Sequence, residues 1–142
     1  MSERDVIKTL NTFLKGQYMG VHAYEHYIKK LEDPSIKKEF QRIQQEHKQH
    51  AQQVSTRIQD LNGTPVDDEG IIGSVQGFIG EFMMPDETDK IIDSAVRAES
   101  YYAVELSEEI VKGDVDPETK ELIEQIIDED RAHVESLHRL LH

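Results

Sequence analysis

Hydrophobic side chains recur every three or four residues along four stretches of this chain. That spacing is typical of a helix that turns one face toward a protein core. Strand-like alternation of apolar and polar residues is not the repeating unit in any of these stretches. The pattern therefore predicts an all-α protein, an antiparallel four-helix bundle. The predicted helices cover residues 2–31, 34–62, 87–112 and 117–141.

Turn signals divide these helices into two hairpins. Asp33-Pro34 and Asp116-Pro117 each combine an N-cap residue with proline at the first helical position, so a helix begins directly after a tight turn. Two long helices joined by such a short turn pack antiparallel. At 142 residues the chain has the size of one domain, and we predict a single domain over residues 1–142.

The segment between the hairpins, residues 63–86, has a different composition. Glycine and proline interrupt any regular pattern there, and large apolar side chains gather between residues 71 and 83. The segment is long enough to return along the bundle, which predicts a crossover connection that leaves all helices antiparallel. Its surplus of apolar side chains also predicts a partner surface, most simply that of a homodimer.

The second hairpin repeats the first. The alignment that places Asp33 on Asp116 also places Ile43 on Ile126, Glu46 on Glu129, His47 on Asp130 and His50 on His133. This alignment shifts the sequence by 83 residues, and a shift of 82 residues places Gln17 on Glu99. Such an internal duplication predicts that the two hairpins pack about a pseudo-twofold axis, with their central residues at mid-bundle.

Polar side chains interrupt the apolar face near the middle of every predicted helix. Burying acids without partners costs several kcal/mol each, on the order expected for uncompensated charge in a core. A divalent cation offsets this cost, and imidazole with carboxylate suits iron, zinc or manganese. A metal-free hydrogen-bonded network is the alternative interpretation. The residues concerned are Gln17, His47, His50, Glu99, Asp130 and His133.

Composition removes several classes of partner and ligand. The 16 Lys and Arg residues against 29 Asp and Glu residues leave a formal charge of −13, which argues against nucleic acid and against an anionic membrane surface. No apolar run approaches the roughly 20 residues of a membrane span, and the polar start does not resemble a signal peptide. With no cysteine, any metal must use histidine, carboxylate, amide or water ligands. These features are compatible with a cytoplasmic protein.

Three local features resemble one known group over nearly the whole chain. They are Leu10-Asn11 with Leu14 in the first helix, the inward Tyr24, and His50-Ala51. The chain resembles the ferritin, bacterioferritin and rubrerythrin superfamily, although the cysteine-bound iron domain of rubrerythrin is missing. The resemblance implies a ferritin-like bundle with a diiron-carboxylate site, to which two helices give one acid each and two give a Glu-x-x-His pair. Apart from this resemblance, Tyr24 and Tyr102 are predicted to be core aromatic residues whose hydroxyls bond to the site ligands.

Carried over by position, the resemblance assigns a carboxylate-poor ligand set. Gln17 and Glu99 stand where the single acids belong, and His47-x-x-His50 and Asp130-x-x-His133 stand where the paired motifs belong. Two ferrous ions would bring +4, whereas the two remaining acids supply −2. We therefore expect one nitrogen-rich divalent site, or an unequal pair with one weakly held ion. Glu46 and Glu129 lie beside the apolar face of their helices and are weaker ligand candidates.

The resemblance implies a ferritin-like metal-binding protein that holds iron, or zinc or manganese, and handles iron with oxygen or peroxide. Whether it is an iron-dependent oxidoreductase stays open, because the weakened carboxylate set disfavours efficient diiron oxidation. The alternative is a non-enzymatic helical interaction module with a degenerate metal site. An iron-storage cage ranks below a dimer, because the fifth helix of ferritin is missing.

Overall fold

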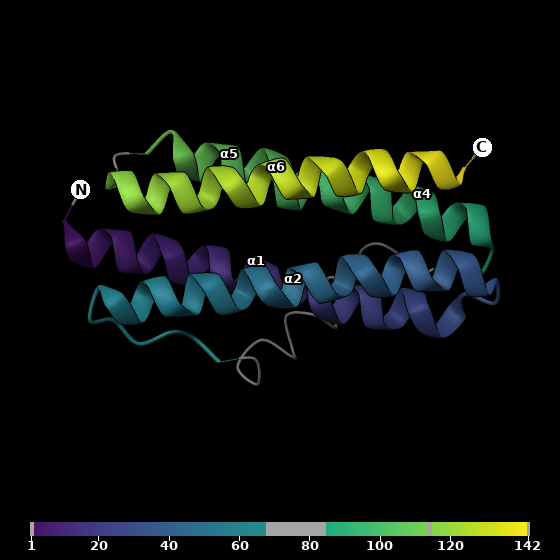
Figure 1. Ribbon diagram of the computed structural model, residues 1–142, viewed down its shortest axis with the longest axis horizontal. Coiled ribbons are helices and arrows are strands. Elements are labelled where there is room, and N and C mark those ends of the chain that lie inside the picture. Colours follow the sequence, from purple (N-terminus) through teal and green to yellow (C-terminus); the bar gives the residue numbers. More distant parts are fainter. Residues whose placement is uncertain (1, 68–84, 114, 142) are drawn as a thin grey trace.

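The computed structural model describes residues 2–67, 85–113 and 115–141, which form an elongated helical bundle (Figure 1). Helices α1 (Glu3–Lys30) and α2 (Pro34–Asp60) form one layer. The other layer contains α6 (Pro117–Leu140) and three consecutive segments, α4 (Thr88–Ala98), η2 (Glu99–Glu105) and α5 (Leu106–Val111). The prediction of an all-α four-helix bundle is confirmed.

The helices begin at side chains that satisfy free backbone N–H groups. Ser2 and Asp5 form a capping box in which the Ser2 hydroxyl accepts from the Asp5 N–H at 3.2 Å. Asp33 accepts from two backbone N–H groups at the start of α2, and proline follows it directly. At the other end of α2, Asn62 adopts a left-handed conformation with φ of 67°, as expected where a helix stops.

Asp116 is the N-cap of α6, as Asp33 is of α2, and among the described residues Asp116 alone of the two also contacts the neighbouring helix. Its Oδ2 accepts from the Thr119 N–H at 3.3 Å and from Arg57 Nη2 at 2.6 Å, so it ties the end of α2 to the start of α6. We expect Asp33→Ala to lower the free energy of unfolding by about 1 kcal/mol, and Asp116→Ala by up to about 2 kcal/mol. Urea unfolding of both variants measures the difference. Equal losses would show that the Arg57 contact contributes nothing.

The apolar core is divided into two clusters, one toward each end of the bundle. Both contain side chains that are almost completely withdrawn from solvent, such as Phe40 in the first and Val54 in the second. The polar residues predicted at mid-helix lie between the clusters, in a layer that apolar groups enclose on two sides. The first cluster includes Ala23, Tyr24, Tyr27, Leu31, Phe40, Ile43, Ile91, Ile92, Ala95, Val96 and Leu137. The second includes Val6, Leu10, Phe13, Leu14, Ala51, Val54, Ile58, Ile123, Ile126 and Ile127.

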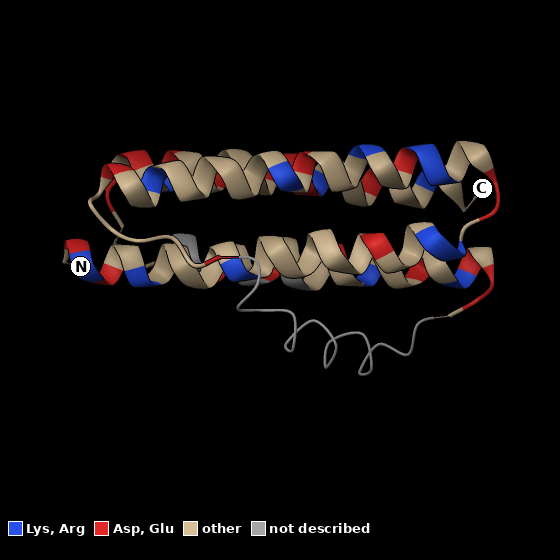
Figure 2. Cartoon of the chain, turned by 90° about the horizontal axis from the view of Figure 1, so that it is seen from below, with Lys and Arg blue, Asp and Glu red and all other residues tan. Residues whose placement is uncertain are grey.

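The buried face of α1 is wider than the single series that its three- and four-residue spacing predicts, which is Val6, Leu10, Leu14, Gln17, Val21, Tyr24, Ile28 and Leu31. Phe13 and Tyr27 are buried although they lie outside that series, whereas Val21 and Ile28 are only partly buried. A helix in a bundle contacts two neighbours, so its apolar face spans more than one row of side chains. Lys, Arg, Asp and Glu residues are distributed along the length of both layers, as Figure 2 shows.

The third predicted helix, 87–112, is not regular. A π-helical segment, η2, begins at Glu99 and separates α4 from α5. The duplication contains a sign of this irregularity, because the interval from Glu99 to Asp116 is longer by a single position than the interval from Gln17 to Asp33. Both η2 and the connection 112–116 lie in the longer interval. Short π-helical segments inside α-helices are frequent at functional sites.

Two predictions concern residues outside this description. Residues 68–84 include most of the predicted crossover and all of the predicted homodimer surface, and they lie outside the described residues. Of the helices that the structure describes, none combines the length and the apolar character needed to cross a membrane.

Candidate metal centre

The six polar residues predicted at mid-bundle are all buried, with exposed fractions of 4% or less. They come from four elements, which agrees with a site on the axis that relates the two hairpins. Gln17 belongs to α1, His47 and His50 to α2, Glu99 to η2, and Asp130 and His133 to α6. The structure therefore brings together every residue of the predicted set.

Glu99 is the most connected acid of this layer. Its Oε1 accepts from the Tyr24 hydroxyl at 2.7 Å and from His47 Nε2 at 2.5 Å, and it lies 3.6 Å from His133 Nδ1. These contacts join α1, α2 and α6 to the first residue of η2. The expected bond between the Tyr24 hydroxyl and a site residue is present, whereas the side chain of Tyr102 is outside the described residues.

Asp130 faces three imidazole rings. Its Oδ1 lies 3.3 Å from His133 Nδ1, 3.5 Å from His50 Nδ1 and 3.9 Å from His47 Nδ1. Neither Asp130 oxygen makes a hydrogen bond with the part of the protein that the structure describes. A fully buried carboxylate surrounded by nitrogen atoms at this range has the surroundings of a metal ligand rather than of an ordinary core residue.

Gln17 lies at the edge of the group. Its Oε1 is 3.2 Å from His47 Nδ1, and its amide contributes no charge. His47 thus faces an amide oxygen with one ring nitrogen and the Glu99 carboxylate with the other. A protonated His47, which has two N–H donors, satisfies both of these acceptors.

Unpaired buried atoms provide the test of whether a metal fits. Within the described residues, six buried side-chain nitrogen or oxygen atoms have no hydrogen-bond partner, and five of them belong to this layer. One ligand atom each from His47, Glu99, Asp130 and His133 can be chosen so that all four lie within 4.8 Å of one another. Nitrogen and carboxylate donors in such a group suit a divalent transition metal. The five unpaired atoms are His50 Nδ1, Glu99 Oε2, both carboxylate oxygens of Asp130, and His133 Nδ1.

The protonation of these groups shows how the site balances its charge without a metal. Burial opposes a charged His133, yet the nearby carboxylates of Asp130 and Glu99 raise its pKa to about 10. Burial also opposes a charged His47, and the charge and hydrogen bond of Glu99 more than offset it and raise the pKa of His47. Burial alone would raise the pKa of Glu99. The charge of His47 and the hydrogen bonds from His47 and His133 nevertheless hold this pKa far below its usual range. At neutral pH a protonated His133 thus places positive charge beside the Glu99 and Asp130 carboxylates.

Asp130 differs from Glu99. Burial is the largest influence on it and raises its pKa above the ordinary value. The ionised form of Asp130 is therefore the least favourable charge of the layer, and it is the one that a cation would stabilise most.

Two glutamates outside the predicted main set also contact the site. His133 Nε2 lies 3.0 Å from Glu46 Oε1, and His50 Nε2 donates to Glu129 Oε2. The prediction treated these acids as weaker ligand candidates because they lie beside the inward face. Their signal in the sequence was the duplication, which aligns Glu46 with Glu129 and places each one helical turn before a histidine.

A cavity of about 370 Å³ adjoins the layer, on the side where α1 faces η2. Gln17, His47 and Glu99 are among the residues that line it, and most of the remaining lining is apolar. Gly16 and Gly20 belong to the lining of α1; a Cβ at Gly20 would lie 3.9 Å from the His47 ring. No described atom would lie within 4 Å of a Cβ at Gly16. The two glycines therefore leave space beside the site.

Several solved structures are similar to this chain, among them the following two. A bacterioferritin-related protein from Bacteroides fragilis, described as a dodecameric thioferritin, superposes with a TM-score of 0.78 at 21% identity, over 99% of this chain and 86% of that one. A two-domain protein from Anabaena variabilis, with DJ-1/ThiJ/PfpI-like and ferritin-like domains, superposes with a TM-score of 0.79 at 17% identity. That match covers 99% of this chain and 40% of the Anabaena chain. At these identities the likeness establishes a ferritin-like fold.

Comparison with curated proteins gives no match. A family profile described as "Domain of unknown function (DUF2383)" matches residues 5–113, which is most of the chain. This protein therefore belongs to the family of that description, and its fold is that of the ferritin-like superfamily.

Proposed function

We propose that this protein holds a divalent metal ion at the middle of its bundle, with iron as the preferred ion. We further propose that it takes part in the reaction of iron with oxygen or peroxide. The observation that supports the proposal most is the group formed by His47, Glu99, Asp130 and His133, whose ligand atoms lie within 4.8 Å of one another in a layer that holds five unpaired buried atoms. A core that served packing alone would fill this layer with apolar side chains, as it does on both sides of it.

The two halves of the duplicated site are unequal. Both acids, Glu99 and Asp130, belong to the second hairpin, whereas their counterparts Gln17 and His47 carry no negative charge. We propose one tightly held ion, with Gln17 beside His47 at its edge, and a weaker neighbouring position at His50 that shares the Asp130 carboxylate. The ligands of the tight position are His47, Glu99, Asp130 and His133.

The protein residues have separate tasks in this proposal. His47 and His133 give up protons when the ion binds, and Glu99 and Asp130 then balance its charge. The Tyr24 hydroxyl, which donates to Glu99 Oε1, holds that carboxylate in place. The cavity beside Gln17 and Glu99 provides room for a small oxidant such as oxygen or peroxide. Iron, when bound, would supply one electron per ferrous ion toward reduction of this oxidant and a coordination position for it.

Elemental analysis of protein purified without chelators tests the proposal. We expect about one tightly bound transition-metal ion per chain and preferential retention of iron. Addition of ferrous iron and oxygen or peroxide should then give ferric absorbance faster than in protein-free buffer. Two tightly bound irons per chain would contradict the unequal site, and metal-free protein that takes up no iron, zinc or manganese would contradict the function.

The second candidate is a helical interaction module with a degenerate site. The bonds from Tyr24 and His47 to Glu99 favour it, because they already form a connected polar network without any ion. In that case the melting temperature would not change when iron, zinc or manganese is added. Metal-dependent stabilisation therefore separates the two functions.

Self-association is also part of the proposal, with a homodimer as the simplest form. Its support is the apolar sequence of residues 71–83 and the dodecameric description of the structurally similar thioferritin. Light scattering coupled to size exclusion distinguishes a monomer, a dimer and a larger assembly of this chain.

A further inference from the structure

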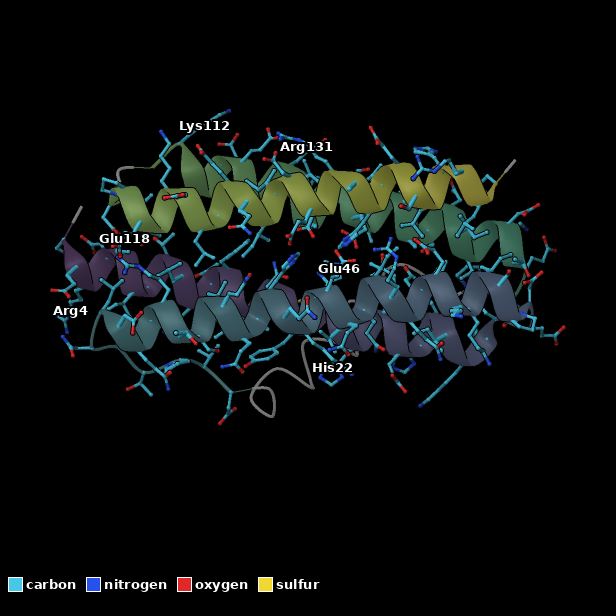
Figure 3. All side chains as sticks on the ribbon, in the orientation of Figure 1. Arg4, His22, Glu46, Lys112, Glu118 and Arg131 are labelled. Carbon is cyan, nitrogen blue, oxygen red and sulfur yellow. The ribbon has the colours of Figure 1, made fainter. Side chains whose placement is uncertain are left out.

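Glu46 and Glu129 exchange partners between the two hairpins. Glu46 of α2 contacts His133 of α6, with Oε1 3.0 Å from Nε2. Glu129 of α6 accepts from His50 Nε2 of α2. The alignment that relates the hairpins converts one pair into the other. In Figure 3 the labelled Glu46 lies near the middle of the bundle, where α2 faces α6.

These contacts determine which nitrogen of each ring faces the site. In His133 and His50 the Nε2 atom points outward to a glutamate, and Nδ1 lies 3.3 and 3.5 Å from Asp130 Oδ1. Both Nδ1 atoms belong to the unpaired buried set. A histidine that binds a metal through one nitrogen commonly donates its other N–H to a carboxylate, which fixes the tautomer and the ring orientation.

We propose that Glu46 and Glu129 are positioning carboxylates of the metal centre: they hold Nδ1 of His133 and His50 toward the ion and supply the negative charge that the ligand set lacks. This inference rests on the proposed metal site. With Glu99 and Asp130 the four acids carry a formal charge of −4, part of which the Arg42 guanidinium beside Glu46 offsets. The two acids absent from the inner layer are thus present on the outer side of the histidines.

The two positioning carboxylates are not equally restrained. Arg42 donates to Glu46 and also to Glu39, one turn earlier on α2. The position that the duplication aligns with Arg42 is Gln125, which has no charge. The Glu46 side chain is 28% exposed and that of Glu129 is 42% exposed. The better-restrained carboxylate therefore lies behind His133, a ligand of the tight position.

Affinity for Co²⁺ and Zn²⁺, measured by competition with a chelating indicator, tests the inference on the full chain. We expect Glu46→Ala to weaken the tight position about 10–100-fold, the usual loss when a carboxylate behind a metal-bound histidine is removed. Glu46→Gln keeps an acceptor oxygen and should recover part of this loss. Glu39→Ala is the matched control, because Glu39 shares the helix, the Arg42 partner and a similar exposure of 26%. It should bind like the wild type.

Glu129→Ala provides the second comparison. It should leave the tight position within a few-fold of the wild type and remove binding at the weaker one. In the Zn²⁺-loaded wild type, ¹H–¹⁵N spectra should show His133 protonated at Nε2 with its hydrogen-bonded proton protected from exchange. Glu46→Ala should lose this protection.

Two results would overturn the inference. One is unchanged Co²⁺ and Zn²⁺ affinity in Glu46→Ala; the other is the same loss in Glu39→Ala, which would indicate a general effect of charge. A lower melting temperature of metal-free Glu46→Ala with unchanged affinity would likewise show a role in folding alone. Failure of the proposed function gives a different result, because the wild type itself would then bind neither ion.

Discussion

Asp130→Asn is expected to abolish the stabilisation of this protein by divalent metal. In the wild type, a free ion concentration 1,000-fold above the dissociation constant adds about 4 kcal/mol to the free energy of unfolding. For a chain of this size that corresponds to a rise in melting temperature of roughly 10 °C. Asn has nearly the shape of Asp but no charge, so the acid that faces three imidazoles in the structure is lost. Thermal unfolding with and without Zn²⁺ or Mn²⁺ measures the effect.

The metal-free form of the same variant shows why Asp130 is present. Because burial raises the pKa of Asp130, its ionised form destabilises the metal-free fold near neutral pH. Asp130→Asn removes this cost but also removes a carboxylate that raises the pKa of His133, so without metal its free energy of unfolding should stay close to that of the wild type. Asp128→Asn, at an exposed acid of the same helix, is the control and should retain the response to metal. A metal-free Asp130→Asn protein that unfolds readily would instead assign Asp130 a structural role.

Alkaline pH is expected to destabilise the metal-free protein through His133. Its pKa in the folded state is about 10 against an ordinary value of 6.5, so the folded state binds this proton more tightly than the unfolded state. The resulting stability is complete below about pH 6.5 and is lost as pH rises through 10. At 1.36 kcal/mol per pKa unit, the loss reaches about 5 kcal/mol. Urea unfolding between pH 6.5 and 10 measures it.

His133→Gln separates this effect from the titration of other groups. It should be less stable than the wild type at pH 7 and should lose much less stability toward pH 10. A parallel fall in both proteins would refute the assignment to His133. Metal binding should show the opposite dependence, because the ligand must lose its proton. Affinity is expected to rise with pH through the same interval, with proton release detectable by calorimetry in buffers of different ionisation enthalpy.

Much of the fold could be predicted because its signals are local. The helix starts at Asp33 and Asp116 follow from one capping side chain and one proline, and the hairpins follow from the short turns that these residues form. The six polar residues could be placed in one layer because helical periodicity and the duplication both point to mid-bundle. The π-helical η2 was missed, since an apolar series does not distinguish a π turn from an α turn over so short a segment.

The partners of the site residues could be predicted less well. The sequence placed Glu46 and Glu129 beside the inward face but did not show which histidine each would contact. That choice depends on the rotation of α2 and α6 about their axes and on their offset along the bundle. A small change in either would pair a glutamate with solvent instead of with the opposite hairpin.

The sequence by itself determined four amphipathic helices in two repeated hairpins, with a polar layer of three histidines, two acids and an amide at their centre. Periodicity, caps and duplication are properties of neighbouring residues and need no knowledge of packing. The tertiary structure decided that Nδ1 of His50 and His133 faces Asp130 while Nε2 faces a glutamate of the other hairpin. Atomic orientation in a core is set by contacts between helices, and those contacts exist only once the bundle has formed.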